Sequence, residues 1–262
     1  MTPFAFLGQF GDAIDIILHK RESVAGGIQV GGSEWLTLIG EHLRISVVAL
    51  AVACAIAIPL GLWLGHIGRG DFLASSFANI GRAVPTYALI AFFVAYIGIG
   101  FQNVALALTL LAIPPIFTNA YVGMRQVDRD TVDAARGMGL TGLGIVRGIE
   151  LPLALPILFG GIRISAVNVV ATATLGPIAG VDDLGKPIIN ANVYGSSGRL
   201  AAALIVALLA IGVELAFAAL QRAVTPAGLR LDDGASGRRS RRLAKPTPLP
   251  PAMASQRGGT TE

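Results

Sequence analysis

The sequence predicts an all-α membrane protein with about five transmembrane helices. Apolar residues make up 53% of the 262 residues and charged residues only 14%. The mean hydropathy is +0.68, which is typical of chains that cross a bilayer several times. The charges are concentrated before residue 45, in residues 125–150 and after residue 221, so long uncharged stretches separate them.

Residues 1–40 are expected to form an N-terminal segment outside the membrane. They lack the pattern of a cleavable signal peptide, because no basic start is present and because Asp12 and Asp15 interrupt the apolar stretch. The apolar residues can form one face of an amphipathic helix at the membrane surface: Phe4, Phe6, Leu7, Phe10, Ile14, Ile17 and Leu18. A complete span is the less favoured alternative, since crossing takes about 20 apolar residues.

Five helical spans are predicted within a transmembrane domain of residues 41–225. They cover residues 45–65, about 73–98, 104–124, 151 to about 180, and 200–221. Pro85 and the Pro114-Pro115 pair are expected to bend the second and third spans, which is tolerated where neighbouring helices satisfy the freed carbonyl groups.

Arg and Lys residues predict the orientation of these spans. With the loop of residues 125–150 inside, thirteen basic residues fall on the inner side and five on the outer side. Cytoplasmic loops are the ones rich in Arg and Lys. We therefore expect a multi-pass protein of the inner (plasma) membrane, with the N-terminus outside and the C-terminus in the cytoplasm. The same enrichment explains the net charge of +4, so no nucleic-acid partner is expected.

Residues 226–262 are predicted to be a disordered, basic cytoplasmic tail. Arg, Pro, Ser, Gly and Thr replace the apolar runs there, so the segment has little surface to bury. Its basic cluster comprises Arg238, Arg239, Arg241, Arg242 and Lys245. The cluster can contact anionic lipid headgroups, and a solvated tail that only fixes the topology is an equally good interpretation.

The loop between the third and fourth spans has the most informative pattern. From Asp133 it reads Asp-Ala-Ala-Arg-Gly-Met-Gly, and nine residues later Ile-Glu-Leu-Pro ends at Pro152. A short helix is expected over 129–138, capped by Asp130 or Thr131. A second short turn capped by Thr141 follows, and Pro152 suits the first turn of the next span.

This pattern resembles the cytoplasmic docking loop of permease subunits in binding-protein-dependent ABC importers, with Asp133 in place of the leading Glu. The resemblance implies a coupling loop at about residues 125–152. It also implies an ATPase-docking set: Asp133, Ala134, Ala135, Gly137, Met138, Gly139, Leu140, Ile149, Leu151 and Pro152.

Two features of the loop bear on the contact with a partner. Met138, Leu140, Leu143 and Ile145 are unusually apolar for a cytoplasmic loop, and each can contribute about 1.5–3 kcal/mol when buried in a partner's groove. For Asp133 two readings stay open: a pair with a cation on the partner, or a pair within its own helix with Arg129 or Arg136.

Further segments resemble the permeases for osmoprotectants, which import glycine betaine, carnitine, choline and proline. The likeness covers roughly residues 35–222. It rests on residues 81–89 (GRAVPTYAL), 117–123 (FTNAYVG), 150–156 (ELPLALP), 161–163 (GIR) and 171–175 (ATATL). Residues 180–185 (GVDDLG) depart from it, since relatives have a glycine-rich turn there.

The resemblance implies the fold of a type I ABC importer permease and its usual partners. These are a second permease subunit (the same chain or a paralogue), an ABC ATPase that binds ATP and magnesium, an extracytoplasmic solute-binding protein and the small solute. The chain itself has no Walker A loop, because Gly185-Lys186 is followed by Pro187 and lacks the upstream glycine. We therefore expect a transport subunit in the lipid bilayer that is not an enzyme and holds no cofactor or metal.

Polar or helix-bending residues within the spans are candidates for the solute pathway: Arg82, Pro85, Arg163, Asn168, Thr172 and Glu214. Arg163 precedes Asp182 by eighteen uncharged residues, or about 27 Å of helix, which puts it near the inner boundary. Glu214 can face a cationic solute, although a pair with Arg163 or Arg82 inside the bundle is favoured. Asn168 and Thr172 can line a polar path or join helices by hydrogen bonds.

Three other functions are alternatives to that of an osmoprotectant permease. An ABC permease for another small solute, such as an amino acid, would share all of the features above. A secondary transporter or channel would work without an ATPase and usually shows internal repeats. A membrane-anchored structural protein is disfavoured by the docking loop.

Overall fold

The computed structural model describes residues 3–225, apart from the side chains of residues 3–7, 80 and 82. The predicted tail and its basic cluster lie outside the described residues. The elements in chain order are α1 (Pro3–Leu18), β1 (Lys20–Glu22), β2 (Gln29–Gly31), α2 (Glu34–His66), α3 (Asp71–Ala83), α4 (Thr86–Ile97), α5 (Phe101–Arg125), α6 (Arg129–Gly137), α7 (Gly142–Ile145), a π-helical turn (Val146–Glu150), α8 (Leu151–Ala173), a 3₁₀ turn (Gly176–Ala179), α9 (Gly185–Ile189) and α10 (Ala191–Val224).

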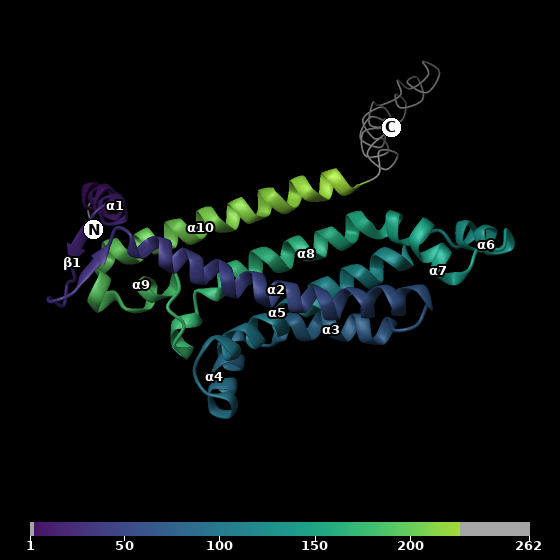
Figure 1. Ribbon diagram of the computed structural model, residues 1–262, viewed down its shortest axis with the longest axis horizontal. Helices are drawn as coiled ribbons and strands as arrows, with labels where there is room; N and C mark the ends of the chain where they lie inside the picture. The colour runs from purple at the N-terminus through teal and green to yellow at the C-terminus, as the bar shows by residue number, and fades with distance from the viewer. Residues whose placement is uncertain (1–2, 226–262) are drawn as a thin grey trace, which may run out of the picture. The chain divides into compact units, whose positions relative to one another are not determined.

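Helix α5 is the centre of the bundle and packs against α2, α3, α4 and α8. Figure 1 shows α2, α5 and α8 running side by side. Small residues allow this close approach: a Cβ added to Gly61 of α2 would lie 2.6 Å from Ala120 Cβ, and one added to Gly161 of α8 would lie 2.5 Å from Asn119 Cβ. Helices in lipid associate through such close contacts, because lipid offers no hydrophobic driving force between them.

Four described helices are long and apolar enough to cross a membrane: 34–66, 101–125, the stretch 142–173, and 191–224. They account for four of the five predicted spans, with different ends. Helix α2 begins at Glu34 and runs past the charges of Glu41 and Arg44, which pair with each other at 3.0 Å. The early start is stabilised because Trp35 and Leu38 are buried in an apolar cluster outside the main core.

The predicted second span, residues 73–98, is not one bent helix, so that prediction was wrong. The chain leaves the helical conformation at Pro85 (φ −70°, ψ 121°) and forms two helices, α3 and α4. Proline lacks the N–H of a helical bond and also disfavours the helical conformation in the residue before it. Figure 1 shows α4 turned away from α3, and its twelve residues are too short to cross a membrane alone.

A small unit at the other end of α2 joins α1 to the beginning of α10. Strands β1 and β2 form an antiparallel hairpin that follows α1. The indole N–H of Trp35 donates to the carbonyl oxygen of Ile16 at 2.9 Å. Helix α1 exists as predicted, but it buries Ala13 and Ile16, whereas Ile14 and Leu18 remain exposed. Its placement at a membrane surface stays a prediction.

Candidate functional site

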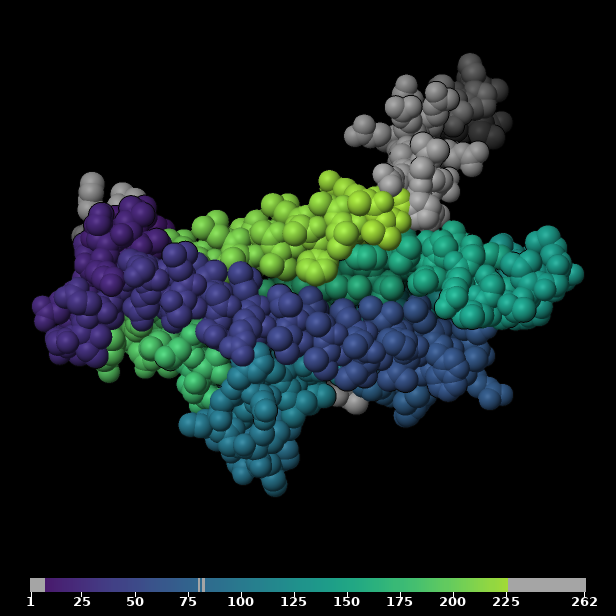
Figure 2. All heavy atoms as spheres, viewed as in Figure 1, coloured from purple at the N-terminus to yellow at the C-terminus, as the bar shows by residue number. Residues whose placement is uncertain are grey.

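Residues 126–150, which we call the elbow, connect α5 to α8 and contain α6, α7 and the π-helical turn. Figures 1 and 2 show the elbow at the opposite end of the bundle from α1. Helix α6 is capped by Asp128, whose Oδ1 accepts from the backbone N–H of Asp130 at 3.0 Å. The prediction of Asp130 or Thr131 as the cap was therefore wrong, whereas Thr141 does cap α7 by accepting from Gly144 N–H at 3.2 Å.

The elbow has an apolar core of its own, which makes it a rigid projection. Val127, Val132, Ala135 and Ile145 are at most 6% exposed, and Ile149 packs against them. Ile145 was expected in the groove of a partner. That expectation was wrong, because this side chain packs α7 against α6 inside the elbow.

The tip of the elbow exposes the other three apolar side chains. Met138 is 74% exposed, Leu143 59% and Leu140 37%. Gly139 turns the chain between them with a φ of +85°, which favours glycine. The tip therefore presents exposed apolar side chains, as a docking surface for another protein would.

Asp133 lies on the outside of α6. Its Oδ1 is 3.1 Å from Nη1 of Arg136, and both side chains are more than 60% exposed. The pair within the helix, one of the two open readings, is thus present in this chain. Exposed pairs of this kind contribute little to stability, so a pair of Asp133 with a cation on a partner stays a prediction.

The end of the elbow contains a contact that the sequence did not reveal. Glu150 is 1% exposed, and its Oε2 lies 2.5 Å from Nδ1 of His66, the last residue of α2. Glu150 occupies the variable position of the Ile-x-Leu-Pro motif, and His66 is 84 residues away. One signal in the sequence could have indicated this contact: the sequence predicts that His66 and Glu150 both lie at span ends on the inner side of the membrane.

Arg163 and Glu214 connect α8 to α10. Arg163 Nε lies 3.3 Å from Oε1 of Glu214, and Arg163 Nη1 donates to Oε1 of Gln221 at 3.3 Å. The amide of Gln221 donates in turn to the carbonyl oxygen of Pro156 at 2.7 Å. Glu214 thus pairs with Arg163, one of the two partners that the favoured interpretation gave it, but its side chain is 45% exposed; a part in the solute pathway stays a prediction. The side chain of Arg82 lies outside the described residues.

Asn168 lines a hollow of about 260 Å³ between α3, α5 and α8, together with Thr118 and Asn119. The Thr118 hydroxyl is buried there without a hydrogen-bond partner among the described residues. Thr172 lies one turn further along α8 and does not line the hollow. Thr118, Asn119 and Asn168 thus give this hollow polar side chains beside its apolar ones.

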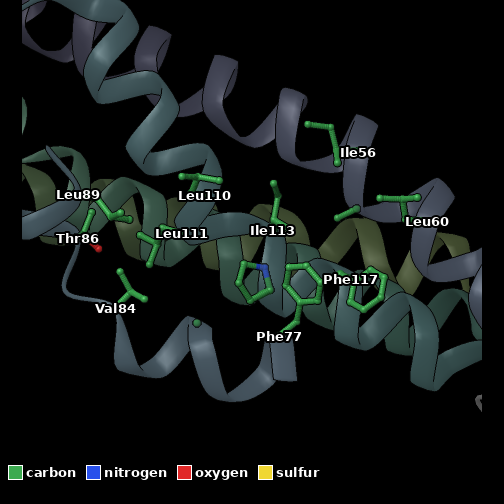
Figure 3. A pocket seen from close by; sticks show the side chains of 13 residues that line it. Ile56, Leu60, Phe77, Val84, Thr86, Leu89, Leu110, Leu111, Ile113 and Phe117 are labelled. Atoms are coloured by element: carbon green, nitrogen blue, oxygen red, sulfur yellow. The ribbon is translucent and has the colours of Figure 1, made fainter. Parts of the chain in front are cut away.

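A larger hollow of about 440 Å³ lies between α2, α3, α4 and α5, next to the break at Pro85 (Figure 3). Among the described residues that line it, Thr86 has the only polar side chain, and the others are apolar. The rings of Phe77 and Phe117 are 4.9 Å apart between centroids. Among the described residues no group of three or more His, Cys, Asp or Glu side chains could hold a metal ion.

The loop between α8 and α10 holds a second buried pair missed by sequence reasoning. Asp183 and His42 are both 0% exposed, and Oδ2 of the carboxylate lies 3.5 Å from Nδ1 of the imidazole. Oδ1 accepts from the backbone N–H of Gly185 at 2.7 Å. Asp183 thus fixes the segment (residues 180–185) that departs from the expected glycine-rich turn.

Known proteins match this arrangement in sequence and in fold. Residues 57–227 match the family described as binding-protein-dependent transport system inner membrane component. The glycine betaine/carnitine/choline transport system permease protein OpuCB of Bacillus subtilis (strain 168) is 35% identical over 204 residues, which are 78% of this chain and 94% of that protein. The carnitine transport permease protein OpuCB of Listeria monocytogenes is 32% identical, over 80% of this chain and 96% of that protein.

Solved structures agree on the fold. The chain is similar to one in the inward-facing MetNI methionine ABC transporter, with a TM-score of 0.63 and 24% identity over 73% of this chain and 96% of that chain. A chain of an amino acid ABC transporter is similar with a TM-score of 0.54 and 17% identity, over 72% of this chain and 91% of that one.

Proposed function

This chain belongs to the family of inner membrane components of binding-protein-dependent transport systems, and from that premise we propose that it is the permease subunit of an ATP-driven importer of small osmoprotectants. It is a multi-pass membrane protein and a transport subunit. The solute we propose is a small quaternary ammonium compound such as glycine betaine, carnitine or choline, because these are the solutes of the relatives that it resembles over most of its length.

The observation that carries the ATP-driven part of the proposal is the elbow. It is a rigid projection with its own core, continuous with α5 and α8, and its tip exposes Met138, Leu140 and Leu143. A separately encoded ATPase that binds ATP and magnesium would cover these side chains and the exposed face of α6. Movement of the ATPase would then reach two membrane helices directly through the chain.

The remaining partners follow from the same arrangement. A second permease subunit would cover α4, whose large exposed side chains include Phe92 and Tyr96. An extracytoplasmic binding protein would deliver the solute to the end of the bundle that holds α1, α9 and the loop with Asp183. In this proposal the elbow lies in the cytoplasm and the N-terminus outside, which the distribution of Arg and Lys supports.

The test is to purify the chain with the proteins that accompany it and to reconstitute that complex in liposomes. We expect an ATPase and a binding protein to co-purify, and we expect ATP hydrolysis and uptake to rise with glycine betaine, carnitine or choline. Uptake of an amino acid such as methionine, with no response to these solutes, would favour the competing amino-acid importer. Uptake by this chain alone, without an ATPase, would refute the proposal.

A further inference from the structure

The contact between His66 and Glu150 joins two elements that the chain does not connect directly. Helix α2 ends at His66, and the elbow ends at Glu150, where α8 begins. Oε2 of Glu150 lies 2.5 Å from Nδ1 of His66. The carboxylate is 1% exposed, whereas the imidazole is 22% exposed. The carboxylate is therefore removed from water, and the imidazole lies between it and the surface.

Glu150 depends on this one contact. Its other oxygen, Oε1, is buried without a hydrogen-bond partner among the described residues, and His66 is the only ion-pair partner that the described part of the chain gives it. A buried carboxylate that loses its partner is strongly unfavourable. When the elbow moves, Glu150 and His66 are therefore expected to move together.

The imidazole also lies beside the beginning of α7. His66 and Gly142 line the same hollow of about 360 Å³, and Nε2 of His66 is 3.5 Å from the position that a Cβ on Gly142 would occupy. The ring thus lies near both the beginning of α7 and the end of the π-helical turn. Turns of this kind occur frequently at functional sites.

Helix α2 can follow the elbow only through non-covalent contacts. The chain connects the elbow covalently to α5 and to α8, but α2 is followed by α3 and has no covalent connection to the elbow. Near its inner end, α2 packs on α5 at backbone distance: a Cβ on Gly65 would lie 2.5 Å from Met124 Cβ. Because α2 is packed tightly at this end, a displacement of His66 is expected to displace α2 as a unit.

We propose that His66 and Glu150 are positioning residues that couple movement of the elbow to α2, so that ATP hydrolysis opens the pathway only while this contact is intact. The proposal rests on the proposed function of the elbow as the ATPase-docking element. Neither residue touches the solute, and the contact does not hold the ATPase.

The test measures the number of glycine betaine molecules imported per ATP hydrolysed in liposomes that contain the complete complex. His66→Ala and Glu150→Leu, whose new side chains can neither donate nor accept, are expected to keep the ATPase bound and ATP hydrolysis running, while the ratio of solute to ATP falls at least tenfold. His66→Asn, whose amide can still donate to the carboxylate, should keep the ratio within about threefold of wild type. His66→Glu alone and Glu150→His alone should each lower the ratio. The double variant that combines them should regain most of it, because the carboxylate and the imidazole then face each other again.

Glu41→Gln is the matched control, because Glu41 also forms an ion pair on α2, with Arg44, but an exposed one; its ratio should equal that of wild type. A wild-type ratio in both His66→Ala and Glu150→Leu would overturn the proposal. Loss of the ATPase from these variants would also overturn it, because the contact would then serve docking. If wild type itself imports no glycine betaine, the proposed function fails instead.

Discussion

Oδ2 of Asp183 lies 3.5 Å from Nδ1 of His42, and no water reaches either side chain. Nε2 of His42 lies 2.9 Å from the carbonyl oxygen of Val170, which can only accept, so Nε2 must carry a proton. Nδ1 of His42 and Oδ2 of Asp183 have no hydrogen-bond partner among the described residues, so each faces only the other. This buried contact joins α2 to the loop between α8 and α10.

Removal of the carboxylate should destabilise the protein strongly. We expect Asp183→Ala to lower the free energy of unfolding by about 3–5 kcal/mol, the usual cost of removing one partner from a buried pair. Asp183→Asn should cost less, because its carbonyl oxygen can still accept from Gly185 N–H. Asp182→Asn is the control, since Asp182 is exposed and pairs with Lys186. Denaturant unfolding in detergent measures all three, and equal effects at the two positions would contradict the prediction.

Two neighbouring glycines of α8 should respond to alanine in opposite ways. Gly161→Ala would place its Cβ 2.5 Å from Asn119 Cβ, whereas a Cβ at Gly160 meets nothing within 4 Å. We expect Gly161→Ala to cost about 1–3 kcal/mol through overpacking and Gly160→Ala to stabilise the helix by up to about 1 kcal/mol. Thermal unfolding in detergent compares the stabilities of the two variants. A Gly161→Ala protein as stable as wild type would mean that α5 and α8 are further apart than the structure shows.

The exposed tip of the elbow should determine the affinity for the ATPase. Met138→Ser and Leu143→Ser each remove a side chain that can contribute about 1.5–3 kcal/mol on burial, so each should weaken ATPase association about tenfold or more. Ile189→Ser is the control, because Ile189 is also exposed but belongs to α9. Co-purification at graded ATPase concentrations gives the affinity. Unchanged affinity in both elbow variants would place the docking surface elsewhere.

Glu214→Gln should retain uptake while weakening the contact between α8 and α10. The glutamine can still accept from Arg163, so we expect a loss of only about 0.6 kcal/mol, the average of polar contacts between membrane helices. Uptake in liposomes and unfolding in detergent should be measured on the same preparation. A folded variant without uptake would place Glu214 in the solute pathway.

The sequence predicted the helices best where apolar runs are long. It failed where packing against neighbouring helices decides whether a helix continues or ends. Proline illustrates this difference. Pro114 and Pro115 remain inside α5, because α2, α3 and α8 enclose it; a Cβ on Gly81 would lie 2.6 Å from Pro114 Cβ. Pro85 has no such enclosure and ends α3. Both patterns look alike in the sequence, so only the neighbours distinguish a tolerated proline from a helix break.

The elbow was predictable as a unit because its motif lies within one short segment. Which of its apolar residues face outward was not, since Ile145 and Leu143 differ only in their direction on a helix of four residues. The pairs of His66 with Glu150 and of His42 with Asp183 were beyond sequence reasoning for a different reason. Their members are far apart in the chain, and only the packing of α2 against α8 and its flanking segments brings them together.

The glycines that let α2, α3 and α8 approach α5 bring these helices to backbone distance at a few points only, which are Gly61 and Gly65 on α2, Gly81 on α3 and Gly161 on α8. At these points a shift of one helix towards α5 would make the two helices collide. Helix α5 therefore limits the movement of its three neighbours there. Where glycines bring helices this close, the bundle resists relative movement of its helices more than a bundle separated by larger side chains would.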